Sequence, residues 1–377
     1  MKVMNRRKFI KYCIASGLSF PFLNFAHSYK DVGFKERSGN TLILVELKGG
    51  NDGLNTVVPY SDPLYYEYRP SLGLKENEIV KINNELALHH SMEGLMPLWE
   101  KKQCAIILGI GYDNPNLSHF RSIEIWDTAS ESDEYVREGW LNSYFKSNKM
   151  SRQDAFIARG LVLGGSSGPL ALLPETLQIR NLKKFLRKST KISTDSHANV
   201  TNRALKKLID TENIIAQAAD NIKLHLKPLN APNGFPKNYF SNQLALAAQV
   251  IQSNLGIPVI KVSLRGFDTH ARQKVTHARL LKQLTEGFVN LESALAATGH
   301  WQKTTIMTYS EFGRRPKENG SAGTDHGTAA PHFLLGGSVK GGLFGKQPQL
   351  AHLDSGNLKY TTHFKQLYKM ALDVTQF

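Results

Sequence analysis

Short, mostly apolar or β-branched runs alternate with longer amphipathic stretches along this chain. The apolar runs are rich in Val, Ile, Leu and Thr and cover residues 41–47, 105–110, 257–264, 304–308 and 332–335. Apolar positions at helical spacing lie between them, at residues 92–102, 120–129, 239–255 and 276–297. Apolar strands that alternate with amphipathic helices are typical of a mainly parallel sheet covered by helices on both faces. The pattern therefore predicts an α/β fold.

One segment, residues 178–236, departs from this alternation. It is polar and rich in lysine, with NLKKFLRKST near its start and KPLNAPNGFPKN at its end, and its pattern is largely helical. We interpret it as a helical cap inserted into one α/β domain that covers residues 29–377. The length of that domain is ample for a sizeable hydrophobic core.

The first 28 residues have the pattern of an export signal. Residues 5–11 read NRRKFIK, a weakly hydrophobic run follows over residues 12–25, and Ala26-His27-Ser28 offers small residues for cleavage. The run is shorter than the span of about twenty apolar residues that crosses a membrane. We therefore expect recognition by the twin-arginine translocase and a periplasmic or secreted protein. An ordinary basic N-terminus and an uncleaved anchor are the alternatives.

The chain is basic, and it contains two cysteines. Its formal charge is +15, and it remains +10 without the five basic residues of the signal. This charge suits an anionic small-molecule or polymer substrate, an anionic envelope surface, or solubility alone. Nucleic-acid binding is not favoured, because the sequence has no zinc-finger, helix-turn-helix or aromatic-rich RNA-binding motif. Only Cys104 follows the signal, which excludes an intramolecular disulfide and a thiolate metal site.

Polar stretches follow four of the five predicted strands or lie between them. They read LKGGNDGLN, DNPNLSHFRS, LRGFDTH and SEFGRRPKENGSAGTDHG. Any one of them could be a solvated surface loop. However, the carboxyl ends of parallel strands meet at one edge of a sheet, where α/β proteins bind ligands. We therefore expect these four stretches to form one site.

Carboxylates and imidazoles predominate among the candidate ligands of that site. Side chains two positions apart in extended backbone point the same way, so Asp268 and His270 could bind one ion together. A hydrogen-bonded pair in a turn is the alternative for them, and a simple Asp-Gly turn is the alternative for Asp52. The candidate metal ligands are Asp52, Asp268, His270, Glu311, Asp325 and His326. Such ligands without thiolate suit zinc, manganese or iron.

Ser118 and His119 stand where the helix over residues 120–129 should begin. A serine in this position caps the helix in most cases, by accepting a backbone hydrogen bond. It is also well placed to act as a nucleophile, because free amides and the helix dipole stabilise an anion there. His119 could be a general base or a packed side chain.

The chain resembles the DUF1501 family, and the resemblance extends from residue 41 to the C-terminus. The motifs that carry it are the twin-arginine leader, LKGGNDGLNTVVPY, SHFRSIEIWDTA, GFDTH, SEFGRRPKENGSAGTDHG and GGSVKGGLFG. That family is similar to a distant branch of the alkaline phosphatase and sulfatase superfamily. The resemblance implies an alkaline-phosphatase-like three-layer sandwich with a mainly parallel sheet.

The superfamily's two-metal pattern matches these positions in part. Asp52 resembles its first metal-binding aspartate, and Ser118 resembles its nucleophile. Asp268 and His270 resemble an aspartate and histidine of one metal site, although the superfamily more often separates the two by three residues. His326 resembles the last histidine.

A further position departs from the superfamily pattern. Glu311 resembles the aspartate of a late Asp-His pair, but Phe312 stands where the histidine is expected. The loss of this imidazole leaves three possibilities: a carboxylate-rich second site, a single-metal enzyme, or a relative without catalytic activity.

An active relative of this kind would hydrolyse phosphate or sulfate esters. The resemblance implies that one ion activates Ser118 or a water and that a second ion stabilises the leaving oxygen, with zinc or manganese as the expected metal. Arg314 or Arg315 would bind the anionic oxygens. Asp325 would bind metal or orient His326.

Other functions remain open at this point. A non-catalytic envelope protein could use the same fold to bind an anionic polymer or a partner protein. A sugar- or lipid-modifying protein could use the cap for recognition. A cofactor-dependent oxidoreductase is not supported, because the sequence has no nucleotide-binding glycine pattern and no thiolate cluster.

Overall fold

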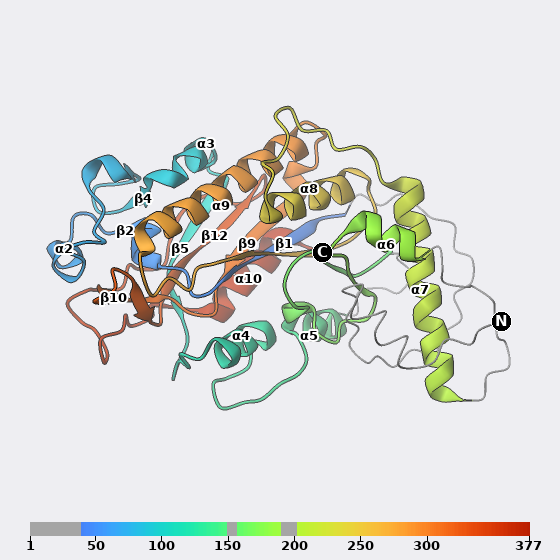
Figure 1. The fold of residues 1–377 in the computed structure, drawn as a ribbon, viewed down its shortest axis with the longest axis horizontal. Helices are drawn as coiled ribbons and strands as arrows, with labels where there is room; N and C mark the ends of the chain where they lie inside the picture. Colours follow the sequence, from blue (N-terminus) through green and yellow to red (C-terminus); the bar gives the residue numbers. More distant parts are fainter. Residues whose placement is uncertain (1–38, 149–156, 190–201) are drawn as a thin grey trace.

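A nine-stranded sheet forms the centre of the computed structural model, which describes residues 39–148, 157–189 and 202–377 (Figure 1). The strand order is β13-β5-β12-β9-β1-β8-β6-β7, and β14 pairs with β5. The strands are β1 (Thr41–Lys48), β5 (Cys104–Gly111), β6 (Gly160–Val162), β7 (Thr176–Gln178), β8 (Val259–Arg265), β9 (Thr304–Tyr309), β12 (Ala330–Gly336), β13 (Gly342–Phe344) and β14 (Thr362–His363). Only β12 is antiparallel to its neighbours in this sheet. The predicted, mainly parallel sheet is confirmed.

Helices cover both faces of the sheet and make three layers. Alternate residues of β1 separate the two cores: Ile43 and Val45 pack with one set of helices, and Leu42 and Leu44 pack with the other. The first set is α3 (Met96–Glu100), α8 (Tyr239–Gln252) and α9 (Gln273–Ala296). The second set is α4 (His119–Thr128), α5 (Trp140–Ser147) and α10 (Phe364–Thr375). Figure 1 shows α8 and α9 above the strands and α4 and α5 below them.

The four helices predicted from periodicity are present, with one change. Residues 92–102 divide into a 3-10 helix, η3 (His90–Leu95), and α3, because Pro97 lacks the N–H of a helix interior and lies instead in the first turn of α3. Small elements complete the fold at the edges. They are α2 (Pro63–Tyr68), the sheet of β2 (Val57–Val58), β4 (Ala87–His89) and β3 (Ile79–Lys81), and the sheet of β10 (Arg314–Glu318) and β11 (Thr324–His326).

The polar segment predicted as a cap contains two helices, α6 (Leu182–Ser189) and α7 (Arg203–His225). Phe185 of α6 and Ile222 of α7 belong to the main apolar core, so these helices pack onto the domain. In Figure 1 they lie at the opposite end of the molecule from β10. A role in recognition stays a prediction.

The predicted export signal lies outside the described residues. Among the helices that the structure describes, none combines the length and the apolar character needed to cross a membrane.

A charged cluster is buried between the sheet and α4. Lys261 donates a hydrogen bond to Glu46 at 2.6 Å, and both side chains are almost inaccessible to solvent. Asp127, on α4, faces the same region, and its Oδ1 is buried without a hydrogen-bond partner among the described residues. Gly168 permits this packing, since a Cβ there would lie 2.7 Å from that oxygen. Burial raises the pKa of Asp127 to about 8.

This raised pKa predicts how Asp127→Asn changes the pH dependence of stability. Between about pH 4 and about pH 8 the folded protein keeps a proton that the unfolded chain releases, so this carboxyl lowers the free energy of unfolding as pH rises. Asparagine has no such proton. The stability of the variant relative to wild type should rise with pH, by up to about 1.4 kcal/mol per unit. Urea unfolding at several pH values measures the difference, with Asp133→Asn, at an exposed position, as the control. Parallel profiles would refute the prediction.

Candidate metal centre

Three side chains from different parts of the chain converge at the carboxyl edge of the sheet. His119 is the first residue of α4, Asp268 follows β8, and His326 ends β11 just before β12. Their ligand atoms all lie within 4.8 Å of one another. The strand ends predicted to meet do meet, and we call these three residues the metal centre.

Oδ1 of Asp268 lies in the middle of this group. It is 3.4 Å from Nε2 of His119, 3.3 Å from Nε2 of His326 and 3.0 Å from Nε2 of His270. Tetrahedral coordination with bonds of about 2.0–2.1 Å places ligand atoms about 3.3–3.4 Å apart. The spacing of the two imidazoles of the metal centre from the carboxylate therefore fits a transition-metal site.

Each imidazole of the metal centre makes a hydrogen bond through its Nδ1 atom, the ring nitrogen that does not face Asp268. Nδ1 of His119 lies 2.9 Å from Oε1 of Glu311, and Nδ1 of His326 lies 2.8 Å from the carbonyl oxygen of Leu117. Because a carboxylate and a carbonyl only accept hydrogen bonds, each Nδ1 carries a proton, and each Nε2 is the ring nitrogen that faces Asp268 and could bind a metal ion. This is the arrangement that metal-binding histidines have in proteins.

Glu311 orients His119 instead of entering the metal centre. It is buried, and its Oε1 also accepts a hydrogen bond from the backbone N of Gly49 at 2.9 Å. A glycine is required there: its φ is +122°, and a Cβ would lie 2.2 Å from the backbone N of Asp268. The Gly-Gly pair of LKGGNDGLN therefore brings the loop after β1 against the loop after β8.

Burial, hydrogen bonds and neighbouring charges shift the pKa values of the three residues of the metal centre. Burial opposes ionisation of Asp268, but a hydrogen bond from Arg314 at 2.7 Å outweighs it and lowers the pKa of Asp268 to about 2. The hydrogen bond to Glu311 raises the pKa of His119. Partial burial lowers the pKa of His326. Asp268 is thus an anion over the whole physiological range.

Arg314 does not have the role predicted for it. Its side chain is buried, and its guanidinium donates to Asp268 and to the carbonyl oxygens of Gly49, Gly50, Phe267 and Thr324. These hydrogen bonds link the loops after β1 and β8 to the β10–β11 hairpin. Because they occupy the buried guanidinium, Arg314 cannot also bind substrate oxygens. Arg315, the other candidate, is half-buried, and its Nε makes no hydrogen bond with a described residue.

Asp52 is not brought to the metal centre. It is fully buried, and its oxygens accept hydrogen bonds from Nη1 and Nη2 of Arg69 at 2.7 and 2.9 Å and from Gln273. Burial opposes its ionisation, but the charge and hydrogen bonds of Arg69 outweigh this and lower its pKa. We therefore exclude Asp52 from the proposed metal ligands.

The other predicted residues surround the metal centre. His270 is exposed, and its Nε2 lies 2.9 Å from Nε2 of His326. Asp325 lies outside it, with Oδ1 3.5 Å from Nδ1 of His270. Ser118 is the N-cap residue of α4, but its exposed hydroxyl makes no capping hydrogen bond. The helix-capping alternative for Ser118 is therefore not observed.

Phe312 lies against the two histidines of the metal centre. Its ring centroid lies 4.9 Å from that of His119 and 4.5 Å from that of His326. The phenyl ring packs against both histidines of the metal centre and limits their movement. An apolar side chain therefore borders the metal centre on the side of Phe312.

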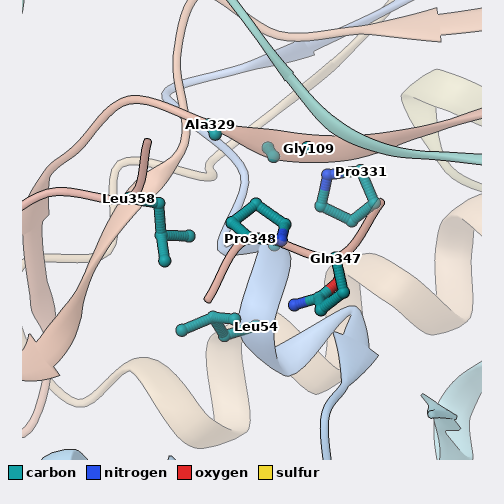
Figure 2. A pocket seen from close by; sticks show the side chains of 9 residues that line it. Leu54, Gly109, Ala329, Pro331, Gln347, Pro348 and Leu358 are labelled. Atoms are coloured by element: carbon teal, nitrogen blue, oxygen red, sulfur yellow. The ribbon is translucent and has the colours of Figure 1, made fainter. Parts of the chain in front are cut away.

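The metal centre is open to solvent. The side chain of His119 is 32% exposed and that of Asp268 is 48% exposed. A separate cavity of about 10 Å³ lies between Leu54, Pro331, Pro348 and Leu358 (Figure 2). It is lined by none of the predicted site residues and has room for about one water.

A family model described as "Protein of unknown function (DUF1501)" matches residues 40–376 of the sequence. A comparison of the sequence with curated proteins found no match.

Several solved structures are similar to this chain at low identity. An alkaline phosphatase from the Antarctic bacterium TAB5 is 11% identical, with 90% of this chain and 99% of the other covered and a TM-score of 0.37. A protein in the alkaline phosphatase superfamily from Vibrio parahaemolyticus is 8% identical, with coverages of 83% and 63% and a TM-score of 0.38. The PsFucS1 sulfatase from Pseudoalteromonas sp. is 10% identical, with coverages of 89% and 68% and a TM-score of 0.37.

Proposed function

The chain belongs to the DUF1501 family, and on that premise we propose that it is an exported, metal-dependent hydrolase of phosphate or sulfate esters. One observation carries the proposal. The Nε2 atoms of His119 and His326 converge on Oδ1 of Asp268, and each imidazole is fixed by an acceptor on its other nitrogen.

His119, Asp268 and His326 would hold one divalent ion, with zinc or manganese as the expected metal. A bound ion of this kind supplies an activated nucleophile and polarises the ester oxygen. A second ion of the superfamily type is not part of the proposal, because Asp52 is bound by Arg69 and Phe312 replaces an imidazole.

The chain's own residues supply the remaining functions. The hydroxyl of Ser118 is exposed and makes no capping hydrogen bond. It lies next to His119 at the start of α4, where free backbone amides stabilise negative charge. We propose it as the nucleophile. Glu311 keeps the proton of His119 on Nδ1, and Phe312 keeps water from one side of the two imidazoles.

Hydrolysis assays test this function. We expect the purified protein to hydrolyse p-nitrophenyl phosphate or p-nitrophenyl sulfate, to lose activity after chelation, and to recover it with zinc or manganese. Ser118→Ala should lower the rate by more than about 100-fold, whereas Ser338→Ala, at the opposite edge of the sheet, should leave it unchanged. Loss of activity on chelation but not in Ser118→Ala would transfer the role of nucleophile to water. A protein that hydrolyses neither ester with any added metal would contradict the proposal.

The alternative, a non-catalytic envelope binding protein, has one observation in its favour. The buried pair of Asp52 and Arg69 removes a carboxylate that the superfamily pattern assigns to a metal. This alternative predicts a folded protein that binds neither zinc nor manganese tightly and shows no hydrolysis.

A further inference from the structure

Two cations lie side by side at the edge of the sheet that carries the metal centre. Lys48, the last residue of β1, and Arg265, the last residue of β8, are register partners on neighbouring parallel strands. On the other side of β1, Glu46 is the partner of Tyr309 in β9. Glu311, two residues past the end of β9, accepts a hydrogen bond from the backbone N of Gly49, the residue after Lys48. Glu311, Lys48 and Arg265 therefore form a row along the carboxyl ends of three adjacent strands.

This row faces the side of the sheet that α4 covers. Even-numbered residues of β1 point to that side, because Leu42 and Leu44 pack with α4, α5 and α10. On β8 the odd-numbered residues point the same way, as the buried bond between Lys261 and Glu46 shows. Alternation along each strand extends this direction to Lys48 and Arg265. They therefore project toward the same side as α4, which begins at His119 with Ser118 as its N-cap.

Neither cation has an anionic partner among the described residues. Both side chains are exposed, and neither makes an ion pair or hydrogen bond there. The nearby carboxylates have other partners, since Asp268 is bonded to Arg314 and Glu311 to His119. Like charges on directly paired residues destabilise a sheet. An anion placed between the two side chains would remove that repulsion.

We propose that Lys48 and Arg265 form an anion-binding pair that receives the phosphate or sulfate group of the substrate beside the metal centre. This inference rests on the proposed function for the identity of the ligand. Adjacent strands are about 4.8 Å apart. Lys48 therefore lies about one strand spacing, and Arg265 about two strand spacings, from Glu311, which is hydrogen-bonded to His119. The flexible ammonium and the forked guanidinium suit a tetrahedral oxyanion. The pair supplies the role that buried Arg314 cannot perform.

Binding of inorganic phosphate and inorganic sulfate tests the pair without any assay of catalysis. We would measure both dissociation constants by calorimetry for the full chain, with metal content determined on the same samples. The variant Lys48→Gln/Arg265→Gln should bind the anion at least about 10-fold more weakly, because two charge-assisted contacts are lost. Lys340→Gln, an exposed lysine after β12 at the opposite edge, should bind like wild type. Whichever anion binds more tightly indicates the ester class.

The outcomes separate this inference from the proposed function. Weaker anion binding by the double variant supports the pair even if the protein proves to be metal-free and inactive. Unchanged anion binding, or none in wild type, overturns the pair even if the protein contains metal and hydrolyses esters. Because the double variant removes like charges, its thermal unfolding midpoint should equal or exceed that of wild type. If the double variant fails to fold, Lys48→Gln and Arg265→Gln are tested separately, and each should weaken anion binding by about 3-fold.

Discussion

Replacement of Arg69 by alanine is expected to destabilise the protein by about 3–5 kcal/mol, because it leaves a buried carboxylate without its partner. The side chains of Arg69 and Asp52 are both fully inaccessible to solvent. The guanidinium also donates to Asn55 at 2.6 Å and to the carbonyl oxygens of Arg315 and Pro316 at 3.1 and 2.8 Å. One side chain therefore joins the loop after β1, the end of α2 and β10.

Chemical unfolding monitored by fluorescence measures this effect. Lys365→Ala, which breaks an exposed ion pair with Glu131, serves as the control and should cost at most about 1 kcal/mol. The double variant Arg69→Met/Asp52→Leu should recover much of the loss, since it leaves no unpaired buried charge. If Arg69→Ala were as stable as the control, Asp52 would not be held as described and would again be a possible metal ligand.

Replacement of either histidine of the metal centre is expected to weaken metal binding by more than about 100-fold. His119 and His326 would each contribute one ligand atom of three, and the loss of an outer partner alone costs about 10–100-fold. Glu311→Gln should fall within that smaller range, because it removes the charge that orients His119 but keeps a hydrogen-bond acceptor.

Competition with a chromophoric chelator gives the zinc affinity of each variant. His352→Ala, an exposed histidine bonded to Gln349, is the matched control and should bind zinc like wild type. Wild-type affinity in both His119→Ala and His326→Ala would show that the metal, if bound at all, lies elsewhere. Circular dichroism of each variant checks that the fold is retained.

The sequence indicates most of the fold because its five longest strands are rich in apolar and β-branched residues. The sequence also predicts that the polar stretches after these strands meet, since parallel strands end at a common edge, and the convergence of His119, Asp268 and His326 agrees with this. The loops could be assigned to one site from local sequence because each is close to a strand end. The short strands at the sheet's margins, such as β6 and β7, carry too few residues to give a pattern.

The roles of individual site residues depended on partners far away in the chain. Asp52 is bound by Gln273, which is 221 residues distant, and Arg314 is held by Gly50, which is 264 residues distant. No local pattern reveals such pairs. The orientation of the His119 imidazole likewise depends on Glu311, 192 residues away. The one local signal for His119 is its position directly after a serine at the predicted start of a helix, and that position is compatible with several roles.

Zinc and manganese loading followed by anomalous X-ray diffraction tests the central claim most directly. The full chain would be purified without chelator, supplied with either ion, and its metal content determined before crystallisation. We predict one ion per chain, located between His119, Asp268 and His326. A folded protein that takes up neither ion, or one whose anomalous peak lies at Asp52 instead, would contradict the account.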